Sequence, residues 1–152
     1  MLNTNKSKAR TLLLTLALLL PAPYSIAQTG GTISGVWKTF DDDTNQPAAL
    51  VEISEKGGLY SGVILKLLDP NALSTCEKCT DFRKGKPVLG MEILSGMKKT
   101  GESYSGGQIL DPDDGDVYRA EMKLKDQGSK LDLRAYIGIP LLGRTQTWIR
   151  EK

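Results

Sequence analysis

Histidine is absent from this chain of 152 residues, and cysteine occurs only twice. Histidine is the commonest general base in enzymes and the commonest protein ligand of metal ions, so its absence argues against most hydrolytic and metal-dependent mechanisms. Two cysteines alone do not make a four-ligand zinc site. The sequence therefore predicts no catalytic residue, no metal site and no cofactor, and any enzymatic role would depend on Asp, Glu, Lys, Cys or Tyr.

No apolar run after the first 20 residues is long enough to be a membrane span. The N-terminal segment has basic residues, then an apolar run over residues 11–20, then the small-residue site Ser25-Ile26-Ala27, which is the pattern of a secretory signal peptide. A ten-residue helix would span roughly half of a 30 Å hydrocarbon core. We therefore expect residues 1–27 to be a cleaved signal peptide and residues 28–152 to form one periplasmic or secreted domain.

A strong charge of either sign is lacking too. Loss of residues 1–27 would remove three of the 20 basic residues and none of the 18 acidic ones, which leaves a net charge of −1. The remaining basic residues alternate with acidic ones instead of forming a cluster, whereas proteins that bind nucleic acids need a basic surface for the phosphates. Nucleic acid is therefore not an expected partner.

What the sequence does contain is alternation of apolar and polar residues, the pattern of half-buried strands. It is clearest over residues 118–125 and 130–135, which flank the turn Asp126-Gln127-Gly128 and should form an antiparallel hairpin. Weaker strand patterns cover residues 36–40, 49–54, 59–67, 91–97, 104–110 and 145–150. The sequence thus predicts an all-β domain with eight strands.

Eight consecutive antiparallel strands leave two exposed edges unless the sheet closes on itself. Closure pairs the backbone groups of both edges, which favours an up-and-down barrel over a sandwich. Residues 69–87, between the third and fourth strands, form a loop far longer than the turns expected in such a meander. Both cysteines lie in this loop.

Tryptophans near both ends of the domain suggest how the barrel closes. Gly35-Val36-Trp37 begins the first strand and Trp148-Ile149-Arg150 ends the last, an arrangement that resembles the closure of lipocalin-like barrels. In such barrels the indole of the first motif plugs one end, and a basic side chain from the last strand packs over it with a cation–π attraction of about 0.5 to 2 kcal/mol. Both Arg150 and Arg144 are candidates for this basic side chain.

Further motifs cover nearly the whole mature chain: Cys76-Glu77-Lys78-Cys79, Leu89-Gly90-Met91, Tyr104-Ser105-Gly106-Gly107, Ile109-Leu110-Asp111-Pro112, and Leu141-Leu142-Gly143-Arg144-Thr145-Gln146-Thr147-Trp148. Together with the opening Gly-x-Trp, they resemble a bacterial family of exported proteins known as a domain of unknown function. The resemblance implies a lipocalin-like barrel and an envelope or secreted location. It implies no particular activity, ligand or catalytic residue.

Cys76 and Cys79 are expected to form a disulfide, because thiols pair in the oxidising compartment that a signal peptide implies. Closing a loop of about four residues stabilises the fold by only roughly 2 kcal/mol in the chain-entropy model. Thiol–disulfide exchange is the alternative role. It would need a thiolate with a lowered pKa, usually within a thioredoxin-type βαβ unit, and no such unit is evident in the sequence.

Two groups of aspartates follow predicted strands, Asp41-Asp42-Asp43 and the segment Asp111-Pro112-Asp113-Asp114-Gly115-Asp116. A calcium-binding EF-hand loop that began at Asp111 would need Gly at its sixth position and Glu at its twelfth, where this chain has Asp116 and Met122. Both groups are therefore interpreted as solvated turns and not as metal sites.

Two functions remain, and they differ in what the barrel contains. A protein that binds a small apolar or amphipathic ligand, our leading hypothesis, needs an open mouth and a cavity of about 300 Å³ or more. A module for envelope interactions or structure would have a filled barrel. The residues expected to line a cavity are Val51, Ile53, Tyr118, Met122, Leu131 and Leu133. Residues 59–67 are apolar on both faces, which suggests a homodimer contact as a further hypothesis.

Overall fold

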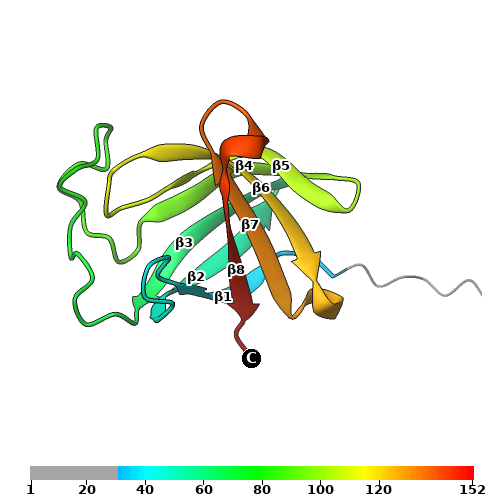
Figure 1. Cartoon of the computed structure of the whole chain (residues 1–152), viewed down its shortest axis with the longest axis horizontal. Helices are drawn as coiled ribbons and strands as arrows, with labels where there is room; N and C mark the ends of the chain where they lie inside the picture. Colours follow the sequence, from blue (N-terminus) through cyan, green and yellow to red (C-terminus); the bar gives the residue numbers. More distant parts are fainter. Residues whose placement is uncertain (1–30) are drawn as a thin grey trace, which may run out of the picture.

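Eight antiparallel strands follow one another in sequence order and close into a barrel (Figure 1). The structure is a computed structural model and describes residues 31–152. The elements are β1 (Gly35–Phe40), β2 (Pro47–Lys56), β3 (Leu59–Leu67), β4 (Glu92–Thr100), β5 (Ser103–Leu110), β6 (Val117–Lys125), η1 (Asp126–Gly128), β7 (Lys130–Tyr136), η2 (Pro140–Leu142) and β8 (Arg144–Arg150). The predicted eight-stranded up-and-down barrel is therefore confirmed. The expected signal peptide, residues 1–27, lies outside the described residues.

The alternation in the sequence places apolar side chains inside the barrel. In β7, Leu131, Leu133 and Ala135 are buried, whereas the residues between them are only partly buried. Met122 of β6 pairs with Leu133. Several strands are longer than predicted, and β4 continues to Thr100. Backbone pairing continues there into polar residues beside the turns, where alternation no longer marks a strand.

Because successive strands run in opposite directions, every second connection lies at the same end of the barrel. Residues 41–46, 68–91, 111–116 and 137–143 join strands at one end, which we call the open end. The short turns after β2, β4 and β6 lie at the other end, which we call the closed end. The longest connection, 68–91, is drawn in green beside the barrel in Figure 1. Within residues 31–152 no helix has the length and apolar character needed to cross a membrane.

The closed end is sealed by Trp37 and Arg150, which come from the first and last strands. The guanidinium carbon of Arg150 lies 4.2 Å from the centroid of the Trp37 ring. Its three nitrogens donate hydrogen bonds of 2.7 to 2.8 Å to the carbonyl oxygens of Thr32, Ser34 and Gly128. One side chain therefore ties together the segment before β1, the turn after β6 and the end of β8.

Gly35 leaves room for this arginine. Its φ is 130°, which residues with side chains rarely adopt, and a Cβ there would lie 2.7 Å from Nη1 of Arg150. Glycine is the residue that tolerates both conditions. Arg144, the other arginine considered for this role, lies at the mouth of the cavity at the open end.

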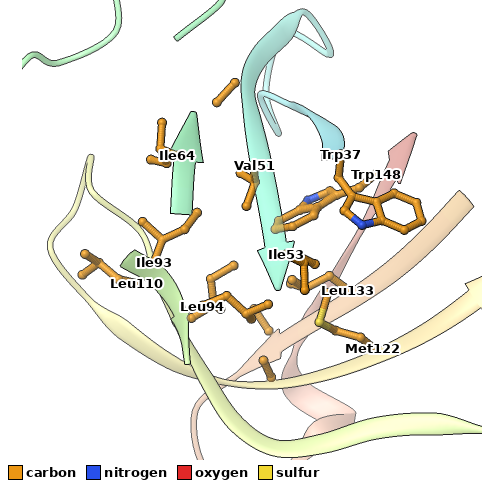
Figure 2. Close-up of a cluster of buried hydrophobic side chains, with 14 of the residues drawn as sticks. Trp37, Val51, Ile53, Ile64, Ile93, Leu94, Leu110, Met122, Leu133 and Trp148 are labelled. Carbon is orange, nitrogen blue, oxygen red and sulfur yellow. The ribbon is translucent and has the colours of Figure 1, made fainter. Parts of the chain in front are cut away.

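Large apolar side chains fill the closed half of the barrel. Trp37, Ile53, Met122 and Leu131 are at most 1% exposed, and Figure 2 shows the first three among the side chains that converge on the interior. Protein interiors pack at the density of organic crystals, so this half acts as a solid plug.

The barrel is joined by a short ladder between β1 and β8. These strands pair at two positions, Trp37 with Arg150 and Lys38 with Ile149, whereas β2 and β3 pair at eight. We call this short ladder the seam. Few backbone pairs hold the seam, so the side-chain bonds of Arg150 add most where the backbone ladder is weakest.

Candidate functional site

The open half of the barrel contains a cavity of about 440 Å³. Its mouth lies among residues of the connections 41–46, 68–91 and 111–116, and its walls come from the inward faces of the strands. We call the apolar part of the lining the floor, and it includes Val51, Ile64, Ile93, Leu110, Leu133 and Trp148, all labelled in Figure 2. The volume lies within the range of protein pockets for small molecules.

The six residues predicted to line a cavity fall into two groups. Those that line it are Val51, Tyr118 and Leu133. Those that do not are Ile53, Met122 and Leu131, which are buried outside the lining. The sequence does not separate the two groups, because alternation identifies the side chains that point inward but not their depth in the barrel.

Trp148 begins a chain of hydrogen bonds that runs from the floor of the cavity to its mouth. Its indole N–H donates to Oε1 of Gln146 at 3.1 Å, and Nε2 of Gln146 donates to Oδ1 of Asp42 at 2.7 Å. From the sequence, Trp148 is expected among the residues that close the barrel. In the structure it belongs to the cavity floor, and its polar atom is satisfied within the site.

Two turns with the same hydrogen-bond pattern lie at the mouth, at residues 41–46 and 111–116. In each turn the N–H of the first residue donates to the carbonyl oxygen of the sixth, and the N–H of the fifth donates to that of the first, at 2.8 to 3.0 Å. The fifth residue has a positive φ, 56° for Asn45 and 79° for Gly115, and asparagine and glycine are the residues that adopt this region most readily. Both turns therefore present their aspartates from a defined backbone.

Arg144 reaches from β8 to both of these turns. Its Nη1 lies 2.9 Å from Oδ2 of Asp42, and its Nη2 lies 3.1 Å from Oδ2 of Asp111. The guanidinium carbon also lies 5.8 Å from the centroid of the Tyr118 ring. The positive charge of Arg144 is therefore already balanced by two carboxylates.

Carboxylates dominate the charge around the cavity. Its charged lining residues are Asp41, Asp42, Asp43, Asp69, Asp111, Asp113, Asp114, Lys78 and Arg144. Thr44 donates hydrogen bonds of 2.7 and 2.6 Å from its N–H and hydroxyl to Asp41, which lowers the pKa of that carboxyl. Desolvation, followed by the negative charges of Asp111 and Asp41, raises the pKa of Asp113. The excess of carboxylates makes the electrostatic potential at the mouth negative.

Tyr118 fixes one side of the mouth. Its hydroxyl donates a hydrogen bond to Oδ2 of Asp114 at 2.8 Å. This bond is the main cause that raises the pKa of Tyr118 to about 12, and desolvation and the charges of Asp114 and Asp116 act in the same direction. The phenol therefore stays protonated at neutral pH and remains a donor to the acidic turn.

From the sequence, the aspartates of 41–43 and 111–116 are interpreted as solvated turns, and their local pattern does not connect them with a cavity. The signal that could have found them is the topology, because the connections after odd-numbered strands of a meander share one end. Within residues 31–152 no three His, Cys, Asp or Glu side chains come close enough to hold a metal ion. The aspartates form a rim around the mouth and not a cage.

Cys76 and Cys79 lie at disulfide-bonding distance, with their Cα atoms 5.5 Å apart and both side chains buried. Sγ of Cys76 lies 3.5 Å from the carbonyl oxygen of Pro112. A Cβ on Gly115 would collide with the carbonyl group of Lys78. The cysteine segment of the long connection therefore packs directly on the turn 111–116 and supports one side of the mouth.

Comparisons with known proteins agree with this architecture. Residues 35–150 match the model of a family described as "Uncharacterized protein conserved in bacteria (DUF2147)". A similar solved structure carries the description "Protein HP1028 from the human pathogen Helicobacter pylori belongs to the lipocalin family". The two chains are 21% identical with a TM-score of 0.70, and the match covers 80% of this chain and 84% of that one. This similarity establishes a lipocalin-like fold. No match was found among curated proteins.

Proposed function

The chain belongs to this bacterial family, and from that premise we propose that its barrel binds one small amphipathic molecule in the cavity at the open end. The observation that supports this function most directly is the cavity of about 440 Å³ with its polar mouth and apolar floor. Burial of the apolar part of a ligand stabilises a complex by about 25 cal/mol for each Å² removed from water. A barrel with a purely structural role needs no such cavity.

The arrangement of the lining favours one orientation of the ligand. Val51, Leu133 and Trp148 offer apolar contacts below, and the hydrogen-bonding and charged side chains lie above. An unpaired polar group is costly to bury in apolar surroundings. The apolar part of the ligand is therefore expected inside the barrel and its polar part at the mouth.

Fluorescence titration with N-phenyl-1-naphthylamine, a neutral apolar dye, tests the proposed binding. Gln146 and Thr147 are neighbours on β8, but Gln146 lines the cavity and Thr147 is exposed outside. We expect the wild-type barrel to bind one dye molecule. We expect Gln146→Phe to weaken binding at least about tenfold, because its ring occupies the cavity, and Thr147→Phe to leave binding unchanged.

Equal dye affinity in the wild type and in Gln146→Phe would contradict the proposal, because the dye would then bind elsewhere. Absence of dye binding to the wild type, together with a ligand-free mass in native mass spectrometry of protein purified from its own envelope, would also contradict it. Circular dichroism melting of both variants establishes that each barrel is folded before its affinity is interpreted.

We also propose that the protein works in the periplasm or outside the cell. The distance between Cys76 and Cys79 supports this location, because disulfides persist mainly in oxidising compartments. The expected product in the envelope or medium is a chain that begins at residue 28 and is two hydrogens lighter than its reduced form. A full-length, reduced chain in the cytoplasmic fraction would contradict the location.

A redox role for the two cysteines has less support. Thiol–disulfide exchange requires access of a thiolate to one sulfur, and both cysteine side chains are at most 1% exposed. Their packing against the turn 111–116 favours a structural role in holding the mouth.

An interaction module is the second candidate function, and the connection between β7 and β8 favours it. Ile137, Ile139, Leu141 and Leu142 are each more than half exposed, and exposed apolar patches are typical of interaction sites. Light scattering of the wild type and of a Leu141→Ser, Leu142→Ser double variant tests self-association. A dimer that dissociates in the variant would support a homodimer through this connection, and a wild-type monomer would count against it.

A further inference from the structure

We infer that the ligand of this cavity is a cationic amphiphile, whose apolar body enters the barrel and whose positive head group stays at the mouth among the aspartates of 41–43 and 111–114. This inference rests on the proposed binding function and adds the charge of the ligand to it. It follows from three properties of the cavity: the position of its charged residues, the excess of negative over positive charge, and the ion pairs that Arg144 already forms.

The charged residues of the cavity are confined to its mouth. Every charged lining residue belongs to a connection at the open end, or, in the case of Arg144, to the first position of β8. The floor is formed by aliphatic side chains and Trp148. Because an ion without a partner is very costly to bury in apolar surroundings, a charged ligand group has to remain at the mouth.

Negative charge prevails there. The seven aspartates of the lining outnumber its two basic residues by five. The carboxylates of Asp43 and Asp113 accept no hydrogen bond and form no ion pair within residues 31–152. Desolvation and the nearby carboxylates of Asp111 and Asp41 raise the pKa of Asp113. An arriving positive charge relieves this repulsion.

The competing hypothesis is an anionic ligand, such as a fatty acid, anchored by Arg144. The guanidinium of Arg144 is already bound to Asp42 at 2.9 Å and to Asp111 at 3.1 Å. An anion that bound the remaining N–H groups of Arg144 would lie beside both of these carboxylates. Even in bulk water, two opposite charges about 4 Å apart raise an affinity roughly fivefold, and two like charges at that distance lower it by the same factor.

Titration calorimetry with three ten-carbon probes separates these hypotheses. Decylamine, decanol and decanoate have the same alkyl chain, and at pH 7 their head groups are positive, neutral and negative. We expect decylamine to bind at least about tenfold more tightly than decanol, and decanoate to bind most weakly. The preference for decylamine should shrink at high salt, because salt screens exposed charges.

Three variants, each with one charge removed, test whether the preference for decylamine arises at the mouth. Asp113→Asn should weaken decylamine binding about three- to tenfold, and its turn should be kept because no hydrogen bond ends on the Asp113 carboxylate. Arg144→Gln should tighten decylamine binding by a similar factor, because it removes a competing cation. Glu102→Gln removes a carboxylate from the turn between β4 and β5 at the closed end, so it should leave binding unchanged.

The possible outcomes distinguish the inferred positive charge of the ligand from the binding function on which it rests. Equal affinities for the three probes, or tightest binding of decanoate with loss of that binding in Arg144→Gln, would overturn the cationic ligand while the proposed binding function stands. Equal decylamine affinity in all three variants would overturn it as well, because the attraction would then not arise at the mouth. Failure of every probe and of the neutral dye would overturn the binding function itself. Circular dichroism melting checks that each variant is folded.

Discussion

Arg150 and Arg144 lie on the same strand but make contacts of different kinds. Arg150 is partly buried over Trp37 and donates three hydrogen bonds to carbonyl oxygens. Hydrogen bonds from a charged group contribute more than neutral ones, and carbonyls left unpaired in a partly buried place add to the loss. We expect Arg150→Ala to lower the free energy of unfolding by about 3 kcal/mol, measured by urea denaturation followed with far-ultraviolet circular dichroism.

Arg144→Ala is the matched control for that substitution. Arg144 is about half exposed and pairs with two aspartates at the mouth, and exposed ion pairs contribute between about 0 and 1 kcal/mol. We therefore expect a loss of at most about 1 kcal/mol. Losses of equal size in the two variants would show that the contacts over Trp37 do not seal the closed end.

Tyr118 should make the stability of the barrel depend on pH in the alkaline range. Its pKa in the folded state is about 12, above the ordinary value of 10.0. A raised pKa means that folding favours the protonated phenol, so its contribution is complete below pH 10 and is lost as the pH rises to about 12. Urea denaturation of the wild type and of Tyr118→Phe between pH 9 and pH 12 should show a stability difference that shrinks with increasing pH. A constant difference would contradict the bond to Asp114.

At the scale of elements, the contact between the cysteine segment and the acidic turn can be tested with two glycines. Gly115 and Gly138 have the same φ of 79°, but a Cβ on Gly115 would collide with the backbone of Lys78 and Cys79, whereas a Cβ on Gly138 would meet nothing within 4 Å. Positive φ alone costs a residue with a side chain about 1 to 2 kcal/mol. Gly138→Ala should lose about that much stability.

Gly115→Ala should lose roughly 2 kcal/mol more than Gly138→Ala, because one of the two packed segments has to move. It should also weaken binding of the dye, since the displaced turn is part of the mouth. Thermal melting and the dye titration measure the two effects. If both variants lost the same stability, strain alone would explain the result and the packing of the two segments would contribute nothing.

The strands could be predicted from the sequence because each one needs only a local pattern. Alternation in residues 118–125 and 130–135 reflects a single fact, that one face of a strand is buried. The depth of a side chain in the barrel is a different property. Ile53 and Val51 point inward from the same strand, yet only Val51 reaches the cavity, because depth depends on the stagger of all eight strands and on the volume of the side chains below.

The sequence also does not decide whether Arg144 or Arg150 packs over Trp37, because alternation does not give the position of a side chain along the barrel. Arg144 and Arg150 have the same parity on β8 and therefore share a face, but they lie at opposite ends of the strand. The end at which Trp37 lies decides which of them can contact it. The acidic mouth cannot be predicted from a local pattern, because its two turns are 70 positions apart in the chain and meet only through the topology.

At the scale of the whole molecule, the seam between β1 and β8 should be the first part of the barrel to open. It has two paired positions, compared with eight between β2 and β3, and a ladder held by few backbone hydrogen bonds opens locally at a lower free energy than a long one. Native-state hydrogen exchange followed by mass spectrometry should show faster exchange in β1 and β8 than in β2 and β3. Arg150→Ala should accelerate exchange at the seam, and β1 and β8 should still exchange faster than β2 and β3.

Equal protection of all ladders would contradict this expectation and would mean that the barrel opens only by global unfolding.

The position of the seam also determines when the fold can be completed. Trp37 and Arg150 are paired neighbours at the seam although they lie near the two ends of the described chain. A ribosome therefore releases seven strands before the eighth can join the first, and a contact between such distant positions is slow to form because the intervening chain has to be ordered first. Until β8 has been synthesised the barrel cannot close, so the growing sheet keeps two unpaired edges that are open to pairing with other chains.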